Sequence, residues 1–160
     1  MKAEIKKLWT DALRSGEYKQ GYGMLRSKED EFCCLGVLCE LAVKAGVIPP
    51  AEQSPYHDRY QYQDASTGLE DMVLTWPVCE WAGLMEPPSE DGEGTYPIVD
   101  PIVNYNDTGR GLADVNDECI WLTPEGEPVD DDYHTLDGAE LHTLRPNDFN
   151  IIADLIDAQL

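Results

Sequence analysis

The chain has 160 residues, of which 42% are hydrophobic, and this size and composition suit one folded domain and exclude wholesale disorder. Its 32 acidic residues far outnumber its 11 Lys and Arg residues, so the net charge of −21 disfavours direct binding to nucleic acid or to an anionic membrane. We see no secretory leader and no apolar run approaching the roughly 20 residues that cross a bilayer, and we therefore expect a soluble cytoplasmic protein.

The acidic charge is concentrated after the first 44 residues. Up to Lys44 there are eight Lys and Arg residues and seven Asp and Glu residues, whereas from Ala45 onward there are three and 25. Two interpretations of this excess remain open. It forms a solvated coat that favours solubility, or it forms a surface that docks on a basic protein.

The first predicted element is an amphipathic helix over residues 1–14. Its apolar residues recur at the spacing of one helix face, at Ile5, Leu8, Trp9, Ala12 and Leu13. Gly16 is suited to end this helix. Three glycines between residues 16 and 23 disfavour further helix, so we expect residues 16–26 to form a loop with one short strand around 23–26.

The longest apolar run extends from Phe32 to Val43 and is interrupted by one charge, Glu40. Its apolar residues occupy every side of a helical wheel, which is typical of a helix buried on all sides. The sequence therefore predicts a central helix over about residues 30–44, ended by Gly46 and the prolines that follow it.

The second half of the chain predicts short elements. We expect a loop over residues 51–66, a short helix over 76–82 that begins at a proline, and an edge strand within 96–105. A turn at Asn106 and Asp107 follows. Further on, the pattern predicts a β-hairpin, another strand and a final helix, at residues 118–129, 133–144 and 149–160, the helix being capped by residues 145–148.

Together these elements predict one α+β domain over residues 1–160. The central helix packs against the N-terminal helix, the C-terminal helix and the helix over 76–82, with a small antiparallel sheet at one side. Residues 109–143 are predicted to form an acidic, β-rich insertion within this domain.

The five cysteines predict buried thiols, with no metal site. Cys33, Cys34 and Cys39 lie on the predicted central helix without the spacing of a structural zinc site, and an odd number of cysteines is typical of a reducing compartment. The sequence also contains no nucleophile elbow and no calcium loop. We therefore expect no metal and no cofactor, and no catalytic residue can be named.

The glycine-rich loop is the candidate ligand site, because it is bracketed by basic residues in a chain that has few of them. Backbone N–H groups and cations together bind anions. The candidate residues are Arg14, Tyr18, Lys19, Gln20, Gly21, Gly23 and Arg26, with Asn106 and Asp107. In the alternative interpretation, these bases pair with Glu17, Glu29 or Asp30 and only fix the loop.

Two motifs carry a resemblance to known proteins. The first runs from Trp9 through Ser15-Gly16, Gln20-Gly21 and Gly23 to Leu25-Arg26, and the second is Phe32-Cys33-Cys34-Leu35-Gly36-Val37-Leu38-Cys39. With Trp81-Ala82-Gly83-Leu84, Asn106-Asp107 and the helix over 149–156, they resemble a family of short uncharacterised proteins of tailed bacteriophages and prophages. The resemblance implies a phage source and the cytoplasm of an infected bacterium, and it implies no mechanism.

These features favour a non-enzymatic phage accessory protein that binds and neutralises a host component, such as an anti-phage defence factor. In one version, the acidic part with Asp130, Asp131 and Asp132 docks on a basic host protein, partly as a nucleic-acid mimic. In a second version, the glycine-rich loop sequesters a small phosphorylated nucleotide. A small hydrolase or transferase acting on a nucleotide is the third alternative, and it needs a converging His or carboxylate. The oligomeric state is left open.

Overall fold

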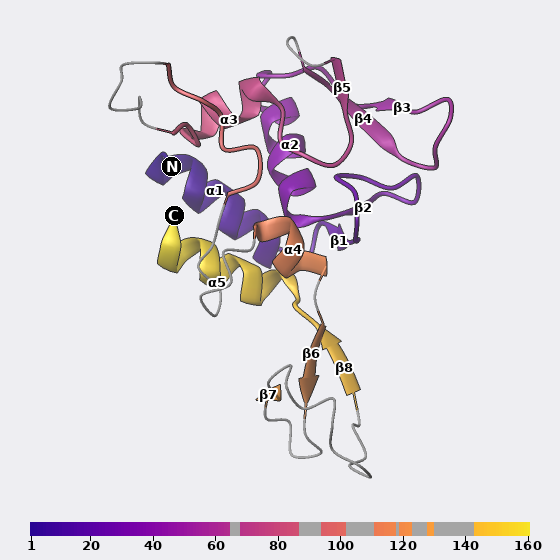
Figure 1. Cartoon of the computed structure of the whole chain (residues 1–160), viewed down its shortest axis with the longest axis vertical. Coiled ribbons are helices and arrows are strands. Elements are labelled where there is room, and N and C mark those ends of the chain that lie inside the picture. The colour runs from indigo at the N-terminus through magenta and orange to yellow at the C-terminus, as the bar shows by residue number, and fades with distance from the viewer. Residues whose placement is uncertain (65–67, 87–93, 102–110, 118, 123–127, 130–142) are drawn as a thin grey trace.

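The helix Cys34–Lys44 (α2) lies at the centre of the fold, as the sequence predicts (Figure 1). In this computed structural model, eight of its 11 residues are buried, on every side of the helix. The structure describes residues 1–64, 68–86, 94–101, 111–117, 119–122, 128–129 and 143–160, with the backbone alone for 119–122, 128–129 and 143–146.

The central helix begins at Cys34, four residues later than predicted. Residues Glu31–Phe32 form a strand (β2) that pairs in parallel with Lys19–Gln20 (β1). Asp30 has a φ of 58°, a left-handed conformation that turns the chain before β2. No strand forms at residues 23–26, where the sequence predicts one. Within this range, Arg26 forms an isolated bridge to Phe32.

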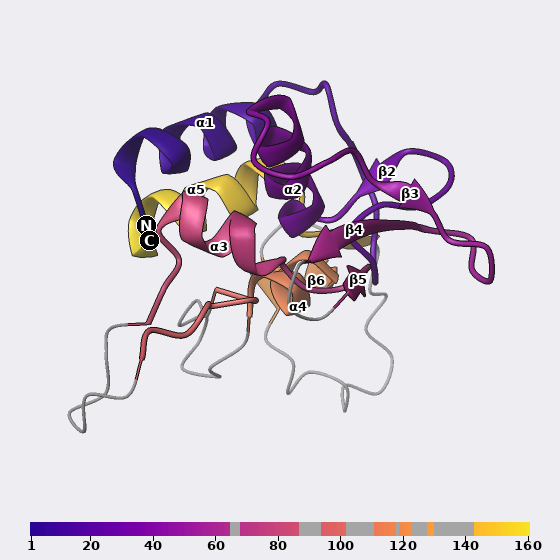
Figure 2. The same ribbon diagram turned by 90° about the horizontal axis from the view of Figure 1, so that it is seen from above.

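Four further helices complete the helical body: Ala3–Arg14 (α1), Trp76–Ala82 (α3), Leu112–Asp117 (α4) and Phe149–Gln159 (α5). Helices α1, α3 and α4 contact α2, and α5 packs along α1 and against α4. Both views show the two chain ends side by side, at the far ends of α1 and α5 (Figures 1 and 2). The indole of Trp9, fully buried, donates a hydrogen bond of 2.9 Å to the carbonyl of Cys34 and so ties α1 to the start of α2.

An antiparallel sheet of three strands covers another side of α2. It consists of Glu52–Gln53 (β3), Tyr60–Asp64 (β4) and Gly68–Glu70 (β5), in the order β3-β4-β5. The prediction of a loop over 51–66 is therefore wrong for its two strands. Tyr62 of β4 is fully buried against the core, while Gln63 next to it is exposed.

A second three-stranded antiparallel sheet extends away from the helices between α4 and α5 (Figure 1). Cys119–Leu122 (β6) pairs with Pro128–Val129 (β7), as the predicted hairpin requires, and with Thr143–Pro146 (β8). Within the range predicted as an insertion, α4 belongs to the core, since Leu112 and Val115 are fully buried. The part that leaves the helices therefore begins after Asp117.

The predicted short helix over residues 76–82 and the predicted C-terminal helix are both confirmed. The helix over 76–82 has a proline in its first turn and ends at Gly83, whose φ is 71°. The last helix is capped by Asp148, whose carboxylate accepts from the amides of Asn150 and Ile151. Of the predicted edge strand over 96–105, the described part shows one isolated bridge, between Met85 and Pro97, and the remainder lies outside the described residues.

Candidate functional site

The glycine-rich loop is held by a buried amide network that links four parts of the chain. Asn116, fully buried in α4, donates to the carbonyl of Gly21 at 2.9 Å and accepts from the backbone amide of Cys34 at 3.2 Å. The side-chain amide of Gln20 donates to Asn116 at 3.2 Å and to the carbonyl of Asn147 at 2.7 Å. The network fixes the loop against the start of α2 and the entry to α5.

The glycines of this loop are required for its shape. A Cβ on Gly21 would lie 2.8 Å from the Cβ of Glu31, because β1 and β2 approach closely there. Gly23 has a φ of 69°, and its amide donates to the carboxylate of Asp117 at 2.9 Å. This backbone N–H group therefore already has an acidic acceptor within the chain.

The basic candidates are each bound to carboxylates of the chain. Arg14 contacts Asp154 at 2.6 Å and Asp157 at 2.8 Å on α5, and these hydrogen bonds raise its pKa. Lys19 pairs with Glu31 across β1 and β2. Arg14 therefore links α1 to α5. Its side chain is directed to α5 and not to the glycine-rich loop.

Arg26 lies between two aromatic rings and two carboxylates. Its guanidinium is 4.3 Å from the ring centroid of Tyr60, and it donates to Glu40 at 3.0 Å and to Asp30 at 2.6 Å. Burial lowers its pKa, but the Asp30 hydrogen bond and the Glu40 charge more than offset this, so the pKa is raised. Tyr62 donates to the same Glu40 oxygen at 2.8 Å, and burial raises the pKa of its phenol.

Tyr18 packs at the edge of the loop, with its ring at right angles to Phe32 and 5.4 Å from it between centroids. Its hydroxyl accepts from Lys44, which also pairs with Glu17 at 2.8 Å. Asn106, Asp107, Asp130, Asp131 and Asp132 lie outside the described residues, so those candidates stay predictions.

Sequence reasoning missed the residues that hold these groups. The partners Asn116, Asp117 and Asn147 lie 94 to 127 positions from the loop residues that they bind, and no local pattern marks them. Glu40 carried a signal, because a single charge inside a buried apolar helix requires a partner. Arg26 and Tyr62 supply it.

Each of the nine Lys and Arg side chains that the structure describes donates to an oxygen of this chain. Seven pair with carboxylates: Lys7, Arg14, Lys19, Arg26, Lys28, Lys44 and Arg59. The other two donate to backbone carbonyls, Lys2 to that of Trp81 and Lys6 to that of Asp157. Seven of the nine described positive charges are thus paired with a carboxylate of the same molecule, and within the described part of the chain the charges of Lys2 and Lys6 are not.

Four thiols are buried in the core. Burial raises the pKa of Cys33 to about 11 and, together with the charge of Asp64, that of Cys79 to about 12. Burial also raises the pKa of Cys34 and Cys39. Among described residues, no three His, Cys, Asp or Glu side chains are placed to share a metal ion.

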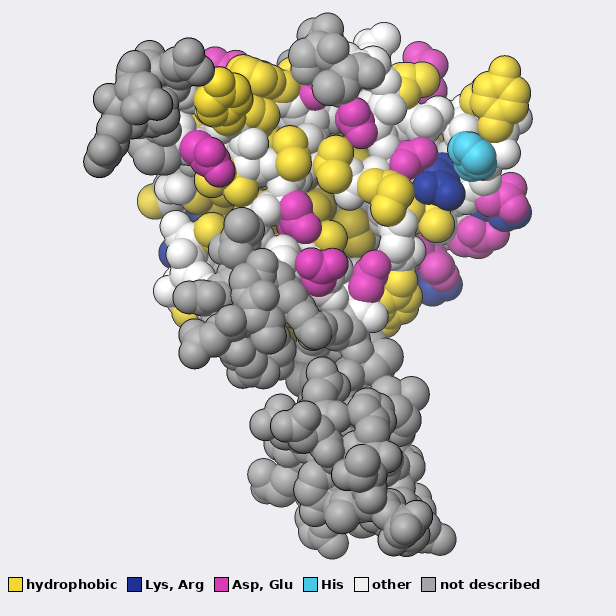
Figure 3. All heavy atoms as spheres, in the orientation of Figure 1, with side chains coloured by type: hydrophobic (Ala, Val, Ile, Leu, Met, Phe, Trp, Pro, Cys, Tyr) yellow, Lys and Arg dark blue, Asp and Glu magenta, His cyan; other side chains and the backbone are white. Residues whose placement is uncertain are grey.

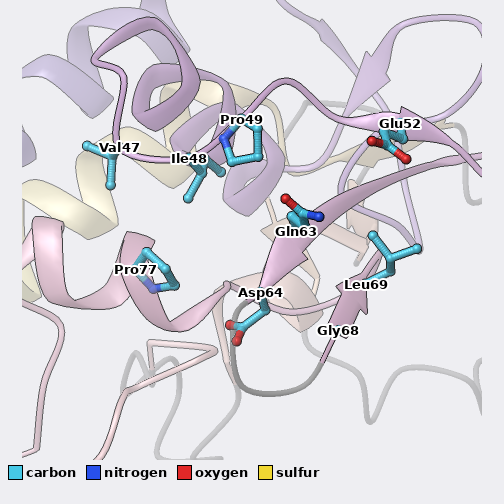
Figure 4. A pocket seen from close by; sticks show the side chains of 9 residues that line it. All are labelled: Val47, Ile48, Pro49, Glu52, Gln63, Asp64, Gly68, Leu69 and Pro77. Carbon is cyan, nitrogen blue, oxygen red and sulfur yellow. The ribbon is translucent and has the colours of Figure 1, made fainter.

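An open groove of about 620 Å³ lies between the chain that follows α2, the outer face of the β3-β4-β5 sheet and the start of α3 (Figure 4). Its apolar lining consists of Val47, Ile48, Pro49, Leu69 and Pro77. Its polar lining consists of Glu52, Gln63 and Asp64, and Asp64 accepts a hydrogen bond from the backbone amide of Trp76.

Fold and surface define an acidic α+β domain in which most of the described bases pair with carboxylates of the chain and which carries an open groove. The chain belongs to the family described as Domain of unknown function (DUF8296), whose model matches residues 1–160. No curated protein and no solved structure matches it. Over the described part of the chain, none of the helices has the length and apolar character to cross a bilayer.

Proposed function

We propose that this protein is a phage accessory protein that acts by binding: its acidic surface docks on a basic surface of a host protein, such as a defence factor, and blocks it. The observation that carries the proposal is that all nine described Lys and Arg side chains donate to oxygens of this chain, seven of them to carboxylates. The acidic excess is then left to act on other molecules.

The electrostatic consequence follows from the net charge of −21. The seven bases that are paired with carboxylates contribute little to the outer field, so a partner meets mainly carboxylates. On the face seen in Figure 3, Asp and Glu side chains stand among the apolar ones, and the Lys and Arg side chains in view lie toward its sides. Such a field speeds association with a basic partner and weakens as salt screens it.

Mimicry of nucleic acid is the specific form that this docking takes when the partner binds DNA. Duplex DNA carries about one charge per 1.7 Å of helix axis, so a protein that competes with it needs closely spaced carboxylates. The run Asp130-Asp131-Asp132 places three acidic residues in succession in the sequence. The resemblance of the first 45 residues to phage proteins supports a host defence factor as the target.

The test is affinity purification from the bacterial host, with mass spectrometry of bound proteins and small molecules, at about 0.05 M and about 0.5 M salt. We expect basic proteins that are retained only at low salt. A variant with Asn at Asp130, Asp131 and Asp132 should lose the partner. Its matched control carries Gln at three exposed acids elsewhere, Glu4, Glu80 and Glu86, and should retain it.

Two results would contradict the proposal. The first is capture of the partner that does not change with salt. The second is heat of nucleotide binding in calorimetry that Lys19→Ala and Arg26→Ala both remove, which would favour the nucleotide-binding alternative. We expect no such heat, since both bases are already bound to carboxylates.

A further inference from the structure

The groove beside α3 leaves apolar surface in contact with water. Leu69 in its lining is 47% exposed, and Trp76, next to the lining residue Pro77, is 38% exposed. On the opposite side Val47 is partly exposed, and Ile48, at 5% exposed, belongs to the core beneath the groove (Figure 4). Apolar side chains gathered at a concave surface mark binding sites more often than scattered ones do.

The groove is also negatively charged. Glu52 and Asp64 are among the nine residues that line it, and none of the nine is Lys or Arg. Glu52 is exposed, so its carboxylate is open to a partner. Asp64 is 5% exposed and is held by the amide of Trp76, so its charge is fixed beneath the groove.

We infer that this groove receives an extended segment of the basic partner, with one aliphatic side chain beside Val47, a second against Leu69 and an adjacent Lys or Arg at Glu52. The inference rests on the proposed function, because it names the place where that partner is held. The apolar contact supplies the part of the affinity that salt does not screen.

Other occupants fit these observations less well. A phosphorylated or acidic ligand would meet Glu52 and Asp64 and be repelled. A second copy of the chain also carries a net charge of −21, so the net electrostatic interaction between two copies is repulsive. A purely apolar ligand would bury the Glu52 carboxylate without a partner.

The test uses two synthetic hexapeptides, one of alternating Lys and Leu and one of alternating Lys and Ser, titrated into the labelled full chain. Methyl NMR spectra follow Val47, Ile48 and Leu69, with Leu8 as the reference. The variants are Leu69→Ser and Glu52→Gln. Their matched controls are Leu8→Ser, at a residue of similar exposure, 43%, and Glu4→Gln, both on α1.

We expect the Lys-Leu peptide to shift the groove methyls and the Lys-Ser peptide to bind more weakly. Leu69→Ser should weaken binding about tenfold and Leu8→Ser should leave it unchanged. Shifts outside the groove, or equal losses in both serine variants, would overturn the groove assignment while salt-dependent binding still supported acidic docking. If neither peptide bound at low salt, the groove assignment and the acidic docking would both be rejected.

Discussion

The carbonyl oxygen of Leu25 occupies the place where a side chain on Gly36 would stand. A Cβ built on Gly36 would lie 1.7 Å from that oxygen and 2.6 Å from the carbonyl carbon. Because Gly36 is in the first turns of α2, this contact brings the end of the glycine-rich loop directly onto the central helix. The fully buried side chain of Leu25 is thereby held in the core.

Replacing Gly36 with Ala should therefore be strongly destabilising. The backbone at Leu25 has to move away from α2, and we expect a loss of about 3 kcal/mol in the free energy of unfolding. For a chain of this size that is a fall of about 6–12 °C in Tm, measured by calorimetry. Gly94→Ala is the control, since an added Cβ meets nothing within 4 Å there. Equal melting of both variants would contradict the close contact.

Leu38→Asp should abolish soluble folding. The side chain of Leu38 is fully buried in α2, and a carboxylate there would have neither water nor a partner. The control Leu8→Asp changes the same residue type at a position that is 43% exposed, and this variant should fold. Circular dichroism and size-exclusion chromatography measure the outcome. A cooperative, near-normal melt of the Leu38 variant would reject the central position of α2.

Stability should fall as the pH rises above about 9. The thiols of Cys33 and Cys79 have pKa values of about 11 and about 12 in the folded chain, against an ordinary value of 9.0, because burial disfavours the thiolate. Above 9 the unfolded chain loses thiol protons that the folded chain keeps, so unfolding is favoured. Each such thiol contributes a slope of at most about 1.4 kcal/mol per pH unit.

Urea denaturation between pH 7 and about pH 10.5 measures this decline, with the upper limit set below the folded-state values. The variant Cys33→Ala should show a shallower decline than the unmodified chain. A flat profile through this range would show that the thiols are more exposed than the structure places them.

Loss of the Glu40 carboxylate should lower the free energy of unfolding more than loss of the Tyr62 hydroxyl that donates to it. Glu40→Leu leaves the hydroxyl of Tyr62 and one arm of Arg26 without their acceptor, and we expect a loss of about 3 kcal/mol. Tyr62→Phe removes one hydrogen bond and should cost about 1 kcal/mol. The control is Asp30→Asn, whose side chain is 63% exposed, and it should cost less than about 1 kcal/mol. Denaturant titration would refute this order if Asp30→Asn cost the most.

Removal of the β6-β7-β8 sheet should leave the helical body folded. The chain leaves α4 and enters α5 at neighbouring points, because the side chain of Asn147 donates to the carbonyl of Val115 at 2.9 Å. A linker of about four residues in place of 119–146 should therefore close the gap. We expect a melting temperature within a few degrees of the full chain, and aggregation of the shortened chain would contradict this expectation.

The helices could be predicted because their signals are local. Apolar residues at i, i+3 and i+4 define α1, and a proline at the start with Gly83 at the end define α3. The burial of α2 on all sides follows from apolar residues around its whole circumference. Its first turn could not be placed, because Glu31 and Phe32 suit a strand as well as a helix.

The β3-β4-β5 sheet could not be recognised for a different reason. Strand β4 reads Tyr-Gln-Tyr-Gln-Asp, and only Tyr62 and Asp64 in it are buried. Alternation with so little apolar contrast gives a weak strand signal. The short helix α4 has two buried apolar residues, Leu112 and Val115, too few to define a period.

For the candidate site, the sequence identified the bases of the loop and, among their partners, Asp30 but not those on distant segments. Asp154 and Asp157 lie 140 or more positions from Arg14, and only the packing of α5 on α1 brings them together. The local alternative named Asp30 for such pairing, and Asp30 does bind Arg26. Ion pairs within one segment can thus be predicted from the sequence, whereas ion pairs between distant segments depend on the fold.

The adjacency of the two chain ends has a consequence for topology. Because the start of α1 lies beside the end of α5, a short linker can join the two termini. The protein can then be circularly permuted, with new termini opened elsewhere in the chain. An exposed site is available near Tyr56, which is 87% exposed between β3 and β4. A permuted protein opened there would keep every helix intact, but α3, α4 and α5 would emerge before α1 and α2 during synthesis.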